Sequence, residues 1–291
     1  MVRRAIAQTF LFAAGMMVGL ALLRPYTGEA EDANPGFWVD KVDHPANLDL
    51  IAVGDSRVYR SIAPSAFAPL RAYNFGFSAM ALDPGYLQDS IAKLDQKSAK
   101  KILLVGLTPN AFSDASRTNG FTSYSHRHLL DRRLLQFSSA GVSWIRPYTP
   151  AEWAALLKPR QHGLPNQEYH DDGWVSSTQS PGDDRKTVEL YSARFRGDAV
   201  RPERVEQFLR AVAEIVKSGI RVVVFRPPVS KALREVEDRQ SGLDVVNVKR
   251  RLLQAGAEWL DVPEDLPTYD GSHLTAESGR KLSAWIAERV R

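Results

Sequence analysis

Residues 51–57 read Ile-Ala-Val-Gly-Asp-Ser-Arg, and this stretch decides the fold that the sequence predicts. The apolar run from Leu48 to Val53 is typical of a buried strand, and Gly54, Asp55 and Ser56 follow it at once. In an open sheet of parallel strands, ligands bind beyond the carboxyl ends of the strands. The stretch therefore predicts a serine hydroxyl at the edge of a sheet where substrates bind.

A second short segment, near the end of the chain, supplies the groups that a reactive serine needs. A serine hydroxyl is a poor nucleophile at neutral pH unless a neighbouring base takes its proton, and that base needs a group to orient it. Asp270-Gly-Ser-His273 places a carboxylate just before an imidazole, in a turn that precedes a predicted helix. We therefore expect Ser56 to act as nucleophile, His273 as base and Asp270 as its partner.

The segments between these two motifs alternate between strand-like and helix-like patterns. Strands are predicted over residues 72–77, 101–107, 220–225 and 257–262, and helices over residues 86–97, 202–218, 229–254 with a break at Ser241-Gly242, and 275–289 with Thr275 as the cap. Strands that alternate with helices indicate an α/β fold with a parallel sheet and right-handed crossovers.

The alternation stops after the third predicted strand, and we interpret residues from about 111 to 200 as a large insertion. So long a stretch without regular alternation is not an ordinary loop, and a lid or a substrate-binding surface would lie there. Its tryptophans, Trp144, Trp153 and Trp174, are expected to be buried, with stacking on sugar rings as the alternative. Its histidines and aspartates lack a recognised ligand spacing, so no metal is expected.

Composition limits the classes of function. Hydrophobic content of 44% and charged content of 25% are ordinary for a folded globular protein. The net charge of +4 is modest for 291 residues and gives no signal for nucleic-acid binding. The chain has no cysteine, which excludes disulfides, thiolate metal sites and thiol catalysis.

The amino terminus predicts a membrane segment. Arg3-Arg4 precedes the uncharged residues 5–23, which at about 1.5 Å per residue nearly span a bilayer core of about 30 Å. We expect residues 1–28 to be an anchor in the inner membrane, crossing it once, with the catalytic domain in the periplasm. Secretion after signal cleavage is the alternative. Residues 29–47 are predicted to be a linker, and residues 48–291 the folded domain.

The two motifs together resemble those of the GDSL, or SGNH, hydrolase superfamily. Gly54-Asp55-Ser56 is similar to the family's nucleophile block, and Asp270-Gly-Ser-His273 to its terminal block. The resemblance covers the chain from about Leu48 onward, with the insertion unmatched. It implies a flavodoxin-like three-layer sandwich, with a Ser56-His273-Asp270 triad and no cofactor.

The resemblance also implies an oxyanion hole. The backbone N–H groups of Ser56 and Gly76 would be two of its donors. The family's Gly-x-Asn-Asp block is replaced by Gly106-Leu-Thr-Pro-Asn110, so that Asn110 is the candidate side-chain donor although it lies off register, and Thr108 is a possible substitute. Arg57 stands where the family signature has leucine, a position that is expected to do no chemistry.

The expected activity is ester hydrolysis or acyl transfer through an acyl-serine. An amino-terminal anchor together with this motif pair is similar to membrane-tethered SGNH-like proteins that modify cell-envelope polysaccharides. This implies an esterase or O-acyltransferase that acts on an acylated glycan or another ester, with envelope polysaccharide machinery as a partner. The alternative is a catalytically inactive protein of the same fold that binds glycan or acts as a scaffold.

Overall fold

The computed structural model describes residues 6, 8–16, 35–117, 119–133, 167–177 and 179–291. Trp144 and Trp153 of the predicted insertion, and residues 1–5, 7 and 17–28 of the predicted anchor, lie outside these residues.

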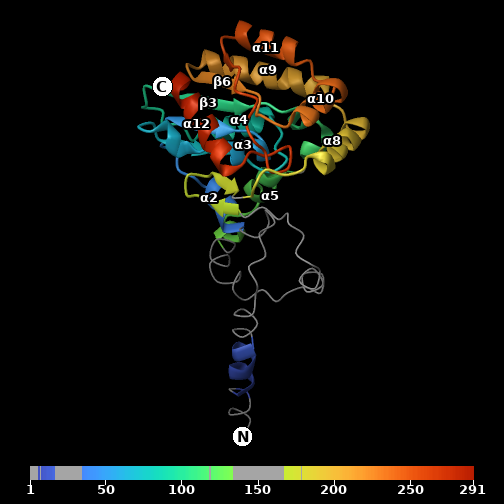
Figure 1. Cartoon of the computed structure of the whole chain (residues 1–291). Helices are drawn as coiled ribbons and strands as arrows, with labels where there is room; N and C mark the ends of the chain where they lie inside the picture. The colour runs from blue at the N-terminus through green and yellow to red at the C-terminus, as the bar shows by residue number, and fades with distance from the viewer. Residues whose placement is uncertain (1–5, 7, 17–34, 118, 134–166, 178) are drawn as a thin grey trace.

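A parallel sheet forms the centre of the domain (Figure 1). Its strands are β1 (Leu50–Val53), β2 (Ala72–Asn74), β3 (Ile102–Gly106), β6 (Arg221–Phe225) and β7 (Glu258–Leu260), in the spatial order β2-β1-β3-β6-β7. Every neighbouring pair in this sheet is parallel. The predicted α/β class with a parallel sheet is confirmed, and the loops that follow β1, β2, β3 and β6 meet at one edge.

Helices cover both faces of the sheet, which gives three layers. On β1, Ile51 and Val53 face one hydrophobic cluster while Leu50 and Ala52 face another, because successive side chains of a strand point to opposite faces. The first cluster takes in α4 (Pro84–Ile91), α9 (Pro202–Lys217) and α11 (Val245–Gln254); the second takes in α3 (Ser56–Ser61) and α12 (Ala276–Val290). This arrangement is consistent with the expected flavodoxin-like sandwich.

Local sequence signals account for several helix boundaries. Pro202 occupies the first turn of α9, where its missing N–H costs nothing. Thr275 caps α12 by accepting a hydrogen bond from the Ser278 N–H, as predicted. The predicted break at Ser241-Gly242 separates α10 (Lys231–Gln240) from α11, and Gly242 has a φ of +80°.

The part of the insertion that the structure describes belongs to the domain. It holds the short helices η3 (Pro109–Phe112), η4 (Asp114–Arg117) and α5 (Gly120–Ser125), the antiparallel strands β4 (Gln167–Tyr169) and β5 (Val175–Ser177), and α8 (Arg185–Gly197). Tyr191 and Phe195 of α8 pack with Val229 and Leu233 in a small hydrophobic cluster. The insertion therefore contributes a helix to the domain, packed beside α10 (Figure 1).

The second half of the expected linker, residues 29–47, contains a helix that packs on the domain. Residues 35–42 form helix α2 (Pro35–Val42), whose side chains Trp38 and Val42 join the main hydrophobic cluster. Their spacing places both on one face of the helix, where Trp38 is 3% exposed. Removing this aromatic and aliphatic surface from water stabilises the helix against the domain.

Residues 8–16 are helical, and the described large apolar side chains of the amino-terminal segment are more than half exposed: Ile6, Phe10, Leu11, Phe12 and Met16. Within the residues that the structure places, none of the helices combines the length and the apolar character that crossing a membrane requires.

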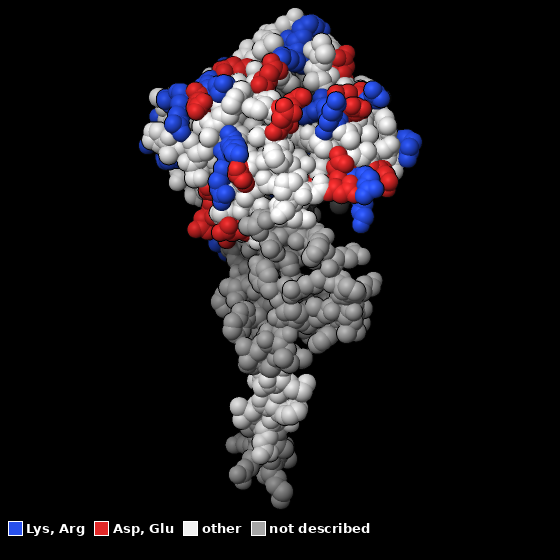
Figure 2. Space-filling model, in the orientation of Figure 1, with Lys and Arg blue, Asp and Glu red and all other residues white. Residues whose placement is uncertain are grey.

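The surface seen in Figure 2 carries both signs of charge in alternation. The chain also forms exposed ion pairs, such as Lys217 with Glu214 (2.7 Å) and Lys281 with Glu277 (2.6 Å). Exposed pairs of this kind contribute little to stability. On the face shown, the charge is distributed rather than gathered into one basic surface.

Candidate active site

Ser56 stands at the first position of α3, directly beyond the carboxyl end of β1. Asp55 caps the helix by accepting a hydrogen bond from the Arg57 N–H (3.0 Å), and its other oxygen accepts one from Thr108 Oγ1 (2.6 Å). Gly54 permits the tight turn: its φ is +149°, and a Cβ there would lie 2.8 Å from the Gly106 carbonyl oxygen. The turn between strand and helix thus fixes the position of the serine.

The structure brings the three predicted catalytic side chains into one chain of contacts. Ser56 Oγ lies 2.8 Å from His273 Nε2, and His273 Nδ1 lies 2.8 Å from Asp270 Oδ2. The imidazole is 18% exposed and the carboxylate 34% exposed. A hydroxyl, an imidazole and a carboxylate in this order have the geometry required to activate a serine.

The loop that carries His273 is held by its own carboxylate. Asp270 Oδ1 accepts hydrogen bonds from the N–H groups of Ser272 (2.9 Å) and His273 (2.8 Å). Burial alone would raise the pKa of Asp270, but the neighbouring His273 and these hydrogen bonds lower it to about 2. The ring of Tyr269 stacks on the imidazole at a centroid distance of 5.7 Å. The base is thus oriented by an ionised carboxylate and supported by an aromatic ring.

Two of the predicted donors for an oxyanion are occupied by other partners. The Gly76 N–H donates to Asn74 Oδ1 (3.0 Å), so the expectation that it faces the reacting carbonyl is not supported. Thr108 Oγ1 donates to Asp55, which removes it as a substitute.

Ala79, in the same loop as Gly76, has a φ of 49°, an uncommon conformation for a residue with a side chain.

Two predicted donors keep free hydrogen-bonding capacity. The Ser56 N–H lies in the first turn of α3, where backbone N–H groups have no carbonyl within the helix to bond. The side-chain oxygen of Asn110, in η3 beyond the end of β3, accepts a hydrogen bond from Arg194 of α8 (3.0 Å). With its oxygen engaged, the amide has its Nδ2 group left to donate to a ligand.

Sequence reasoning missed the residues that surround the motifs. Arg194 lies in the insertion, far from both motifs in sequence, and nothing in its local pattern marks it. Arg57 was expected to do no chemistry, yet it is 1% exposed and contacts both Glu237 and Ser272. The available signal was the charge itself, because an arginine directly after a buried strand and its turn requires a partner.

The described residues include no group of three or more histidine and acidic side chains that could hold a metal ion. His170, in the part of the insertion that the structure describes, stacks on Trp174 at a centroid distance of 4.5 Å and lies 2.9 Å from Ser176 Oγ. Trp174 itself is buried at 3% exposure, as expected for the insertion's tryptophans.

Comparison with known proteins gave two solved structures of one enzyme. No family model and no curated protein matches the chain. The inhibitor-bound form of the aryl esterase of M. smegmatis is similar with a TM-score of 0.37 and 12% identity, and its native form with a TM-score of 0.34 and 13% identity. Each match covers 83% of this chain and 97% of the other.

Proposed function

We propose that this protein is a serine-dependent hydrolase or acyltransferase that acts on esters. The observation that carries the proposal is the contact of 2.8 Å between Ser56 Oγ and His273 Nε2, with Asp270 2.8 Å from the other ring nitrogen. The positions of these groups at the carboxyl edge of a parallel sheet also support it.

The proposed reaction has two steps. His273 accepts the proton of Ser56 as the hydroxyl oxygen attacks the ester carbonyl, and Asp270 stabilises the imidazolium that forms. His273 then gives that proton to the leaving alcohol, which leaves an acyl group on Ser56. Water, or a hydroxyl of a second substrate, attacks the acyl group with His273 again acting as base, and Ser56 is regenerated.

The negative charge on the carbonyl oxygen needs donors that are in place before the reaction. We assign this role to the Ser56 N–H and to Asn110 Nδ2. The support for Asn110 is its location beyond β3 and the hydrogen bond from Arg194 that fixes its amide. Ala79 replaces Gly76 as the candidate donor from the loop after β2, because unusual backbone conformations gather at functional sites.

Replacing Asn110 with alanine is expected to lower kcat by about 100-fold to 1,000-fold, the usual cost of losing one such donor. KM should change little, because the bond to the oxygen strengthens only as charge develops. Steady-state hydrolysis of p-nitrophenyl acetate measures both constants. Asn247→Ala, which removes a partly exposed amide on α11, serves as the control. An Asn110→Ala enzyme with wild-type kcat would contradict the assignment.

Covalent capture tests the proposed nucleophile directly. A fluorophosphonate probe reacts readily only with an activated serine, so it should label Ser56 in the native protein and not in heat-denatured protein. Peptide mass spectrometry would locate the adduct. Failure of the native protein to react would favour the alternative of a non-catalytic protein that binds glycan or acts as a scaffold.

We further propose that the ester is carried by an exported glycan and that the chain is anchored in the inner membrane with its domain in the periplasm. The support is the uncharged segment over residues 5–23 after Arg3-Arg4, together with the resemblance to membrane-tethered SGNH-like proteins. Both hydrolysis and acyl transfer to a sugar hydroxyl use the same acyl-serine. The accepting molecule decides between them.

A further inference from the structure

Arg57 connects the two halves of the candidate site. It follows Ser56 in α3, and its Nε donates a hydrogen bond to Ser272 Oγ at 3.2 Å. Ser272 in turn precedes His273, and its own side chain is buried at 1% exposure. A single side chain thus joins the neighbour of the nucleophile to the neighbour of the base, across most of the length of the chain.

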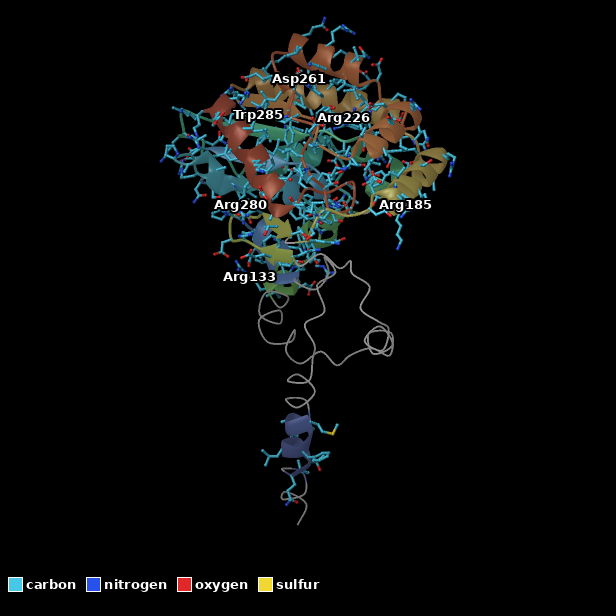
Figure 3. The ribbon with its side chains drawn as sticks, viewed as in Figure 1. Arg133, Arg185, Arg226, Asp261, Arg280 and Trp285 are labelled. Atoms are coloured by element: carbon cyan, nitrogen blue, oxygen red, sulfur yellow. The ribbon has the colours of Figure 1, made fainter. Side chains whose placement is uncertain are left out.

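The other end of Arg57 is anchored to α10. Its Nη1 lies 2.6 Å from Glu237 Oε1, with both side chains almost fully buried. Glu237 also pairs with Arg226 (2.9 Å), which is labelled in Figure 3, and lies 3.5 Å from Arg234. Burial alone would raise the pKa of Glu237, but the three arginines lower it, so the carboxylate is held ionised.

An aromatic ring also contacts the flat face of the Arg57 guanidinium, in addition to the contacts that Ser272 and Glu237 make at its edge. It lies over the ring of Tyr191, at 5.1 Å from the ring centroid, and Tyr191 belongs to α8 of the insertion. Arg194, one turn further along α8, lies over the same ring at 5.3 Å and donates to Asn110. Cation–π contacts of buried arginines are stronger than exposed ones. Arg57 therefore has few orientations open to it.

We infer that Arg57 is a positioning residue that sets the distance between Ser56 and His273 by holding Ser272 against α3, with Glu237 as its anchor. The inference rests on the proposed function, because it assigns Arg57 a role only through the Ser56–His273 contact. It also assigns a task to α10 and α8, which supply the anchor and the aromatic face.

The burial of the Arg57–Glu237 pair favours a positioning role over a purely stabilising one. A charged group that is buried costs stability unless it is paired, and a buried pair is often no more stabilising than an apolar pair of similar volume. Stability alone therefore does not explain why a buried arginine occupies position 57. Precise placement of the reacting groups does explain it, because a displacement of about 1 Å can lower the rate by a factor of about 100.

The test removes the contact between Arg57 and Ser272 from each side separately and then together. Ser272→Ala deletes the acceptor and leaves the Arg57–Glu237 pair intact. Arg57→Lys keeps a positive charge that can reach Glu237 but lacks the Nε–H group that donates to Ser272. Ser90→Ala is the matched control, since Ser90 is also fully buried and donates one hydrogen bond, to the Tyr86 carbonyl oxygen (2.7 Å) in α4.

We expect kcat to fall about tenfold to 100-fold in Ser272→Ala and in Arg57→Lys, with KM nearly unchanged. The rate of fluorophosphonate labelling of Ser56 should fall by the same factor, and the double variant should lose no more than the worse single variant. Thermal unfolding of Ser272→Ala should stay close to that of Ser90→Ala, whose kcat should equal that of the wild type.

Three results would overturn the inference. The first is a wild-type kcat in both single variants. The second is a loss of kcat in the double variant equal to the product of the two single losses, as for independent sites. The third is a fall in kcat that is fully explained by unfolding of the variant at the assay temperature. Wild-type protein that neither hydrolyses the ester nor reacts with the probe would instead overturn the proposed function. The wild-type measurement therefore separates the two failures.

Discussion

Replacing Ser56 with alanine is expected to lower the rate of p-nitrophenyl acetate hydrolysis by about four powers of ten or more. The change removes the hydroxyl that lies 2.8 Å from His273 and leaves the rest of the site in place. The loss should appear in kcat, because no acyl-serine can form. Steady-state assays of the purified full chain, with and without the substitution, measure this loss of kcat.

The control is Ser218→Ala, which removes an exposed serine hydroxyl at the end of α9 that donates to the Ile215 carbonyl oxygen. It should hydrolyse the ester at the wild-type rate. Equal rates from the Ser56→Ala protein and the wild type would show that hydrolysis does not depend on this serine. The triad proposal would then fail, although the fold would stand.

Replacing Asp270 with asparagine is expected to lower kcat by about 10⁴-fold while KM changes little. The carboxylate accepts from His273 Nδ1 and so leaves the other ring nitrogen without a proton, ready to accept one from Ser56. An asparagine can present an N–H to the ring and favour the wrong tautomer. The ester assay of Asp270→Asn measures the loss, and a fall of less than about tenfold would contradict the role of Asp270.

The same variant has a second consequence, in acid. The folded-state pKa of Asp270 is lowered to about 2, whereas an unfolded aspartate titrates near about 3.9. A depressed pKa of a carboxylate contributes stability that is present above the unfolded value and is lost as the pH falls through the folded one. Wild type should therefore lose stability relative to Asp270→Asn between about pH 4 and pH 2, as measured by urea unfolding. A stability difference that stays constant over this range would contradict the prediction.

Regular elements of this chain were predictable because their patterns are local. The apolar spacing of α9, the cap Thr275 of α12 and the β-branched run in β6 each carry their signal within a short segment. Strand β2 ends at Asn74, before the predicted residue 77, although the N–H groups of Phe75 and Phe77 still donate to the Ala52 and Gly54 carbonyls. Helix α2 was missed because its apolar residues follow a proline and a glycine, with polar residues on both sides of the helix.

The motifs located the candidate site, but its supporting contacts could not be read from the sequence. Ser56 and His273 sit in short segments whose turn residues and flanking elements are typical of such sites. Glu237 of α10, which pairs with Arg57, and Arg194 of α8, which bonds Asn110, sit in helices where charged residues are common on exposed faces. Only the packing of α8 on α10 turns these two inward.

Asn110 shows the same limit in a milder form. Its place beyond β3 could be predicted from the strand, while the identity of its partner could not. Gly76 is a second example, because the sequence does not show that the Asn74 side chain turns back to accept a hydrogen bond from its N–H.

The loop at residues 270–273 precedes α12, whose Leu282, Ile286 and Val290 close one face of the sheet. The imidazole partner lies 217 residues after the serine in the chain, so the base is held in place only after α12 has docked. An unfinished or truncated chain would therefore display the hydroxyl without the means to activate it. The serine hydroxyl can therefore be activated only in a chain that has folded as far as α12.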